Sequence, residues 1–407
     1  MTLQNYTNVL IQLTRDSKND TAAQLLGLRS LAPLFLDASD TTRSLCEELE
    51  NTSHLCKAVH RAVTSNMSHP RVVSIGLRIL SHVANLLENA SNDLIFKENV
   101  LPTCVQILQL HHTDIAAVRS ALSLVNSVLT KSNESGIVRF QRIHLIGATL
   151  NTVLNQNIED APTVEFGLAA SAFVGNYGGI HLTSTISNCI ESHPTDIGVV
   201  RAGLSACCHL ARTSAANRMS LIASGAFQYC RAILDLRPAH RDIVVQVGVL
   251  IGTLLKSKHG RKIMLRGGDA NDRLIRLLAG SLPHVNDITK SWFPMLLRSV
   301  LTALTMMSLS SPNARSLLID TCGILQLLDE FLQVKLPSIR LVLDVEMAQA
   351  AIKGELEDDA RDRLFQELDN DGSMEFGQSS KLNKERGQVM KATRDHNGVV
   401  GMKLGSR

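Results

Sequence analysis

The sequence predicts an all-α protein in which short helices stack as a right-handed solenoid of about seven or eight repeats. Two recurring sequence markers and the composition predict this fold. The first marker is a small residue within a helical apolar pattern, and the second is a turn residue that precedes another apolar helix. The composition is 44% hydrophobic but only 3% aromatic, which indicates an aliphatic core.

The first marker is a Gly or Ala flanked by Val and Leu, as in "VRAGL" (200–204). Apolar residues occupy the first and the seventh positions after the small residue, so they form one stripe on a helix. Glycine inside a helix costs about 1 kcal/mol relative to alanine, so its recurrence indicates a position that needs a side chain without bulk. The small residues are Gly27, Gly76, Ala121, Gly167, Gly203, Gly248, Ala303 and Ala348.

The spacings between these residues are 49, 45, 46, 36, 45, 55 and 45. The interval of 55 implies an insertion of about ten residues near 281–296, relative to the period of about 40–47 residues of HEAT and armadillo units. The second marker stands 20–25 residues before the first. It predicts a helix that begins after a turn at each of Asn99, Gly147, Gly179, Gly225 and Gly323.

The stretches "VVRAGLSACCHLA" (199–211) and "VVQVGVLIGTLL" (244–255) resemble the third helix of the armadillo repeat unit. In that family the helix has a Val-Gln-x-x-small-x-x-small-Leu core and follows a glycine-led apolar helix. The resemblance covers roughly residues 20–355, and a HEAT array is the structural alternative. We expect atypical N-terminal capping helices in 1–70, the repeat array in 71–355, and an acidic-then-basic, mostly disordered tail in 356–407.

The resemblance implies a non-catalytic scaffold or adaptor that binds an extended or helical segment of another protein along its concave face. One alternative is a structural component of a cytoskeletal or filament assembly, and another is an enzymatic or small-molecule module. No GxxxxGK[ST] loop, GxSxG elbow or HExxH motif is present, so we expect no enzyme activity, cofactor or metal.

In this family an asparagine six residues after the small residue projects into the concave groove. The equivalent positions here hold no asparagine, so importin-type peptide binding is not expected. They still mark the predicted inner surface, where we expect some side chains to contact a partner. These positions are His82, Ser127, Phe173, His209, Leu254 and Leu309.

The adjacent Cys207 and Cys208 invite comparison with a metal site. Neighbouring helical residues point about 100° apart, so the two thiols cannot easily hold one ion from the same face. We expect both to be core residues. Near the C-terminus, Glu367, Asp369 and Asp371 fall in a degenerate EF-hand-like loop whose last position is Gln378, and calcium binding is not expected.

Two further features have a structural and a functional interpretation. The basic run 256–266 includes Lys258, Arg261 and Lys262. In the structural interpretation, these cations stabilise the negative C-terminal end of the predicted third helix that precedes the run. In the functional interpretation, the run is a docking site for an acidic partner segment. Trp292 lies beside the predicted insertion and either seals a helix junction or forms part of an interface.

The charge and the cysteine content bear on partners and location. The net charge of +3 gives no reason to expect nucleic acid or an anionic membrane as a partner. The sequence begins without a secretory signal pattern, and its eight cysteines have no paired spacing. We therefore expect the thiols to be reduced and the protein to be cytoplasmic. A nuclear location in addition is the alternative.

Overall fold

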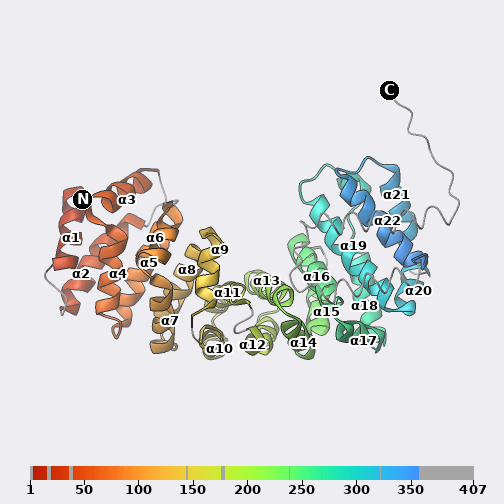
Figure 1. Cartoon of the computed structure of the whole chain (residues 1–407), viewed down its shortest axis with the longest axis horizontal. Coiled ribbons are helices and arrows are strands. Elements are labelled where there is room, and N and C mark those ends of the chain that lie inside the picture. Colours follow the sequence, from red (N-terminus) through yellow and green to blue (C-terminus); the bar gives the residue numbers. More distant parts are fainter. Residues whose placement is uncertain are drawn as a thin grey trace, which may run out of the picture. The chain divides into compact units, whose positions relative to one another are not determined.

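The computed structural model describes residues 3–356, apart from 16–19, 36–39, 88, 144, 176–178, 238, 267 and 321. The regular elements in these residues are all helices, as predicted (Figure 1). The chain divides into two compact units within α13, between His209 and Leu210. The predicted tail, apart from its first residue, lies outside the described residues, and the predicted N-terminal cap stays a prediction.

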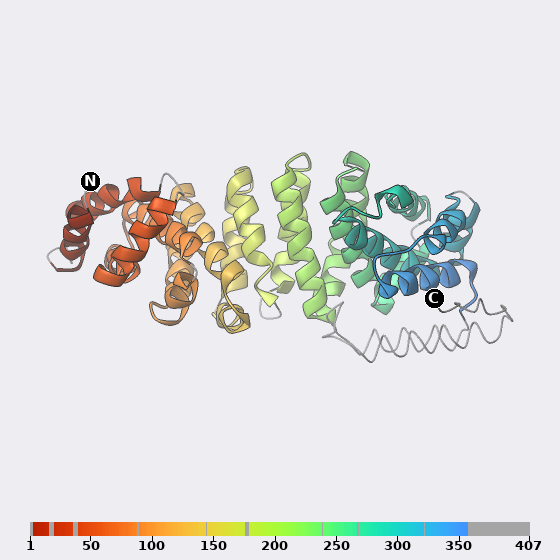
Figure 2. The ribbon, with the colours of Figure 1, turned by 90° about the horizontal axis from the view of Figure 1, so that it is seen from above.

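In unit 1 the helices follow one another along the chain (Figures 1 and 2). They are α1 (Leu3–Arg15), α2 (Thr21–Leu31), α3 (Asp40–Ser53), α4 (Leu55–Ser65), α5 (Pro70–Leu86), α6 (Ala90–Phe96), α7 (Val100–Leu110), α8 (Ile115–Lys131), α9 (Glu134–Gln141), α10 (Ile146–Gln156), α11 (Ala161–Ser171), α12 (Gly179–Ser192) and α13 (Ile197–Thr213).

Unit 2 takes up the last turn of α13 and continues with nine further α-helices among the described residues. They are α14 (Ala215–Ala223), α15 (Ala226–Leu236), α16 (Arg241–Leu254), α17 (Lys258–Arg266), α18 (Gly268–Ala279), α19 (Phe293–Ser310), α20 (Pro312–Asp320), α21 (Ile324–Gln333) and α22 (Ile339–Lys353).

The predicted period corresponds to a unit of three helices. The small residue lies on the third helix of each unit, and these third helices are α5, α8, α11, α13, α16, α19 and α22. Third helices of neighbouring repeats pack on one another, as α5 does on α8 and α16 on α19. Apolar side chains of all three helices fill the core between them.

The glycines of unit 1 lie where the second helix crosses the third. A Cβ atom on Gly76 would lie 2.3 Å from Cγ2 of Val63 on α4, and one on Gly203 would lie 2.6 Å from Cγ1 of Ile190 on α12. Real Cβ atoms essentially never come this close to another heavy atom. The prediction that this position excludes bulk is therefore confirmed at these crossings.

In unit 2 the small residue meets a different neighbour. A Cβ atom on Gly248 would lie 2.8 Å from the backbone oxygen of Ser299, so α16 and α19 approach each other backbone to backbone. Gly252, one turn later, would place its Cβ 3.1 Å from Cγ2 of Thr302. Ala303 and Ala348 are fully buried on α19 and α22.

The two unusual spacings have structural causes. The spacing of 36 falls where α12 follows α11 after residues 172–178, and the described part of that link contains no first α-helix. The spacing of 55 arises because residues 280–292 connect α18 to α19. This connection contains the short 3-10 helix Val285–Asp287, and it confirms the predicted insertion.

The turn before each second helix uses the left-handed backbone region. Asn99, Gly225 and Gly323 take φ of 54°, 83° and 58° there, as the second marker predicts. The marker is wrong at Gly147, which is buried inside α10, while Leu145 takes the left-handed conformation with φ of 62°. Leucine rarely adopts this region, so residue type alone would not predict the turn at this position.

A ladder of hydrogen bonds joins the turns between second and third helices in unit 1. The first residue of each turn bonds to the backbone carbonyl of the second residue of the preceding turn. We call this the turn ladder. Its three rungs are His111 Nε2 to Met67 O (2.6 Å), Asn157 Nδ2 to His112 O (2.8 Å) and His193 Nε2 to Ile158 O (2.6 Å).

The fourth residue of these turns caps the third helix that follows. The carboxylates of Asp114, Asp160 and Asp196 accept hydrogen bonds from the backbone N–H groups three residues later, at 2.9, 3.1 and 3.0 Å. Such caps satisfy N–H groups that the helix itself leaves without a partner. Each of these turns therefore caps the third helix that follows it and also links that helix to the preceding repeat.

Candidate partner-binding surface

The side chains predicted to face a partner lie on or just after the third helices. In unit 1, His82 on α5 and His209 on α13 are exposed, whereas Ser127 on α8 and Phe173, two residues after α11, are half-buried. The imidazole of His82 stacks on Phe35 with 6.0 Å between ring centroids. Burial and the nearby Arg78 guanidinium both lower the pKa of His82.

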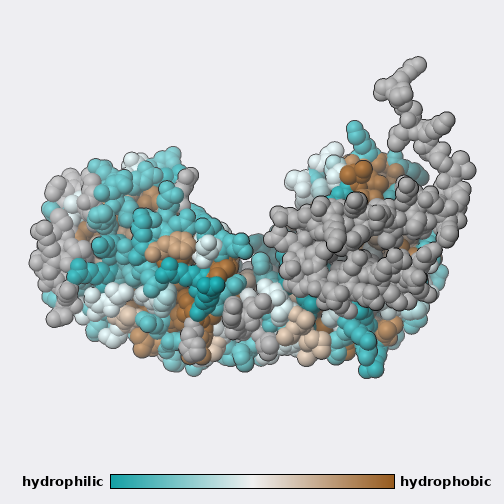
Figure 3. Space-filling view, in the orientation of Figure 1, coloured by the Kyte–Doolittle hydropathy of each residue, from teal (hydrophilic) through white to brown (hydrophobic). Residues whose placement is uncertain are grey.

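Between the two histidines the side chains are short, apart from that of Phe173. Four residues before each of the predicted positions stand Arg78, Ser123, Ala169 and Ser205, of which Arg78 is exposed and the others are half-buried. We call these eight residues the third-helix surface of unit 1: Arg78, His82, Ser123, Ser127, Ala169, Phe173, Ser205 and His209. Hydrophilic side chains dominate the face of unit 1 seen in Figure 3.

Hydroxyl groups hold α5 and α8 together beneath this surface. Ser81 Oγ lies 2.9 Å from both Ser123 Oγ and Ser127 Oγ, and Asn85 Nδ2 donates to Ser127 Oγ at 3.1 Å. Further along, Asn126 Nδ2 donates to the backbone oxygen of Phe166 on α11 at 2.9 Å. Ser127 therefore fixes the spacing of two third helices as well as lining the surface.

The equivalent positions of unit 2 are more deeply buried. Leu254 has no accessible surface and Leu309 is half-buried. Leu254 is the last residue of α16, and a Cβ on Gly260 of α17 would lie 2.3 Å from the Leu254 backbone oxygen. Leu254 is thus a core residue and not part of the predicted partner surface.

The basic run forms the end of α16, a turn and α17. Arg261 Nη1 donates to the backbone oxygen of Lys256 at 2.6 Å, just beyond the C-terminus of α16. This contact fits the structural interpretation of the run, in which a cation stabilises the end of the preceding helix. Lys258 and Lys262 are exposed on α17.

Trp292 directly precedes α19 and is half-buried. The guanidinium carbon of Arg241, at the start of α16, lies 3.9 Å from the centroid of its ring, which is a cation–π contact. Phe293 is fully buried and meets Phe331 edge to face. Trp292 and Phe293 lie at the junction between the connection 280–292 and α19, and Arg241 covers one face of the Trp292 ring.

Cys207 and Cys208 belong to the core, as predicted. Cys207 is fully buried and Cys208 is 5% exposed, and none of the eight cysteines forms a disulfide. Within the described residues no group of three His, Cys, Asp or Glu side chains could hold a metal ion. The EF-hand-like residues Glu367, Asp369 and Asp371 lie outside the described residues.

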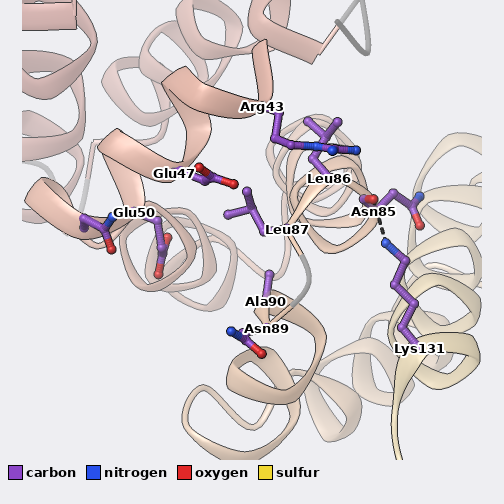
Figure 4. Close-up of a pocket in the computed structure, with 10 residues that line it drawn as sticks. Arg43, Glu47, Glu50, Asn85, Leu86, Leu87, Asn89, Ala90 and Lys131 are labelled. Atoms are coloured by element: carbon purple, nitrogen blue, oxygen red, sulfur yellow. Dashed lines mark hydrogen bonds between the residues drawn. The ribbon is translucent and has the colours of Figure 1, made fainter. Parts of the chain in front are cut away.

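A polar cleft of about 530 Å³ opens between α3, α5, α6 and α8 (Figure 4). Its side chains include Glu50, which accepts from the Cys56 N–H at 2.7 Å, and Lys131, which donates to the backbone oxygens of Ala84 and Asn85. These groups stabilise the start of α4 and the end of α5. The ten lining residues include no Ser, Cys or His.

One helix among the described residues, α19, is long and apolar enough to cross a membrane. About 72% of it is buried inside the protein, and the core helix of a soluble domain passes the same test. Its buried face packs against α16 and α22. This is weak evidence for a membrane span.

Comparisons with solved structures concern the fold. An engineered protein determined by the Northeast Structural Genomics Consortium matches with a TM-score of 0.58 and 13% identity, covering 98% of this chain and 100% of that one. A designed armadillo repeat protein in complex with the peptide (KR)4 matches with a TM-score of 0.45 and 17% identity, covering 62% and 99%.

A structure from work on the interaction between cadherin and beta-catenin matches with a TM-score of 0.47 and 11% identity, covering 96% and 94%. No family model matches the sequence, and no curated protein matches it significantly. At these identities the likeness is one of fold alone. The match to the engineered protein and the repeated three-helix units confirm the predicted fold, an α-solenoid of armadillo-type repeats.

Proposed function

We propose that this protein is a non-catalytic scaffold whose unit 1 binds an extended segment of another protein along the third-helix surface. The observation that carries the proposal is a set of short side chains on three successive third helices, α8, α11 and α13, with the exposed His82 and His209 at its two ends. Short side chains leave room for a partner's backbone to lie close to the helices.

The geometry of stacked helices sets the length of such a segment. Packed helices lie about 8–10 Å apart, and an extended chain advances about 3.3 Å per residue. One third helix therefore corresponds to about three residues of an extended partner, and four helices to about ten residues. The fixed spacing of α5 and α8, which the serine contacts hold, makes this surface pre-organised, and pre-organisation favours binding.

We also propose that the protein acts in the cytoplasm or the nucleus. None of its eight cysteines forms a disulfide, and seven of them are buried in the core. Core thiols without disulfides fit a reducing compartment.

The test compares what the full-length protein captures from cells with what two variants capture. The variant R78E/H82E/H209E changes the third-helix surface. The variant K57E/R61E changes two exposed residues of α4 and makes the same change in charge, with neutral histidines counted as zero. We expect a set of proteins that the wild type and the α4 variant retain and the surface variant loses.

Two results would contradict the proposal. Captured proteins that respond equally to both variants would remove the third-helix surface as the binding site. Stable co-purification with a polymer that neither variant disturbs would favour the structural alternative instead.

A further inference from the structure

Charge is unevenly distributed along the sequence. Residues 210–356 contain 18 Lys and Arg against 11 Asp and Glu, a net charge of +7, whereas residues 1–209 contain 14 against 17, a net charge of −3. The next segment, 357–375, contains two Arg against eight Asp and Glu, a net charge of −6. A strongly acidic segment therefore directly follows the basic unit.

Exposed cations of unit 2 concentrate on α17 and α18. Lys258, Lys262 and Arg266 are exposed on α17, and Arg276 is exposed on α18. Within the part of the chain that the structure describes, none of these four forms an ion pair, in contrast to Arg273, which binds Asp235 at 2.8 Å. We call these four residues the α17–α18 cationic surface. With Asp269 and Asp272 included, residues 258–279 still carry a net charge of +4.

The acidic segment starts close to this surface. The described chain ends just after α22, where a Cβ on Gly354 would lie 2.8 Å from Nη1 of Arg315 on α20. Helix α20 packs against both α22 and α18. The 19 residues of 357–375 can span at most about 60–70 Å, which is ample to pass one helix and reach α17.

We propose that residues 357–375 dock in the same molecule on the α17–α18 cationic surface. The segment and that surface carry opposite charges. The last described residues of unit 2 place the first residue of the segment one helix away from the surface. Covalent attachment gives the segment an effective concentration in the millimolar range at this surface, where it competes with acidic segments of other proteins. The docked segment therefore excludes weak acidic partners from α17. This proposal concerns a different surface from the proposed function and does not depend on it.

Carbodiimide cross-linking of the full-length protein tests the contact directly, because this reagent joins a carboxylate to a lysine amine only where the two touch. We expect links within one molecule from 357–375 to Lys258 or Lys262, and fewer of them as salt rises, since exposed charges are screened. Exposed Lys290 and Lys335 of unit 2 and Lys57 of unit 1 serve as internal controls.

Three cross-linking results would overturn the proposal. The acidic segment could link equally to the control lysines, or to the lysines of the basic stretch 376–407 and not to α17. It could also link to α17 only between two molecules, which a dimer band on a denaturing gel would show. Each of these outcomes gives the segment a different neighbour.

Trypsin cleavage after Arg361 and Arg363 provides an independent measurement on the full-length protein. The variant K258E/K262E is compared with K290E/K335E, which makes the same change in charge at exposed lysines of unit 2 outside α17 and α18. We expect cleavage at the two arginines to become about threefold faster or more in K258E/K262E, and to change less than twofold in the control variant. Equal rates in the two variants contradict docking on α17.

Discussion

The Nε2 atom of His111 lies 2.6 Å from the backbone oxygen of Met67, which belongs to the preceding turn between a second and a third helix. An imidazole can make this contact only by donating the Nε2 hydrogen. The side chain thus satisfies a carbonyl of one repeat from the turn of the next, and the turn ladder holds successive repeats in place independently of the apolar core.

Replacing His111 with Ala should lower the free energy of unfolding by about 1 kcal/mol, because a carbonyl loses its partner. His111→Asn should retain much of the stability, since Asn157 makes the equivalent contact. Urea denaturation measures both. The control is His112→Ala, whose ring hydrogen-bonds to the Gln109 carbonyl of its own repeat at 3.1 Å. A loss in the control as large as that in His111→Ala would remove the ladder as the cause.

Gly203→Ala should destabilise the protein by about 1–3 kcal/mol, although alanine is the better helix former. The added methyl would meet Ile190 at 2.6 Å, so the cost should shrink when Ile190→Ala is already present. A double-mutant cycle in urea measures this coupling, which we expect to be about 1 kcal/mol or more. Strictly additive effects would show that Ile190 is not the obstacle.

Gly248→Ala provides a contrast because its neighbour is backbone. The added methyl would lie 2.8 Å from the Ser299 oxygen, which no side-chain substitution can remove. We expect a loss of stability at least as large as that of Gly203→Ala, without rescue by Ser299→Gly. Thermal unfolding of the two alanine variants, measured side by side, checks the order.

The cysteines should react very unequally with thiol reagents. Burial raises the pKa of Cys104 and of Cys189 to about 12, so almost no thiolate forms at these residues at pH 8. Cys322 is the one cysteine that is not buried, although burial raises its pKa as well. Native protein should release about one equivalent from a disulfide reagent, and unfolded protein eight. Rapid reaction of several native thiols would contradict the buried positions.

Asp160 should make stability depend on pH in the acid range. Burial alone would raise the pKa of its carboxyl group, but hydrogen bonds from Arg119 and Thr163 outweigh that effect and lower it. The lowered folded-state pKa contributes stability at pH values above the ordinary carboxyl pKa, and the contribution disappears as pH falls through the lowered value.

Asp160→Asn should therefore reduce the difference in unfolding free energy between pH 7 and pH 3 by up to about 1 kcal/mol, as for other partly exposed pairs. Asparagine is also a good helix cap, so α11 should keep its start. Urea denaturation at the two pH values gives the difference. An unchanged difference would mean that the Arg119 contact contributes nothing to stability.

Arg261 and Lys262 should separate the structural from the surface role of the basic run. Arg261→Gln removes the bond to the Lys256 carbonyl and should cost about 1 kcal/mol of unfolding free energy. Lys262→Gln changes only an exposed side chain and should stay within about 0.5 kcal/mol of the wild type. Similar losses in both variants would contradict the helix-end role of Arg261.

The repeat was predictable because the requirement at its crossing is steric and local to one residue type. Any side chain at Gly76 or Gly203, even the methyl group of alanine, would meet a side chain of the second helix. The sequence therefore shows the period directly as a recurring small residue. Asp114, Asp160 and Asp196 also carried a signal, a helix-capping aspartate at a recurring position, that the sequence interpretation missed.

Other features depend on neighbours that the period does not identify. Leu254 has the same phase as the exposed His82, yet Leu254 is the last residue of its third helix and has no accessible surface. The rungs of the turn ladder vary between His and Asn because the acceptor is backbone, which any donor of suitable length can reach. Leu145 takes a backbone conformation that its residue type disfavours, so no local pattern indicated it.

The turn ladder has a consequence for how such a chain can lengthen. Each intermediate turn is both donor and acceptor: His111 gives a hydrogen bond to the repeat before it, while the His112 carbonyl receives one from the repeat after it. A duplicated repeat inserted in frame would carry both the side-chain donor and the backbone acceptor of the turn ladder. It could then be linked on its two sides without any compensating substitution elsewhere in the array.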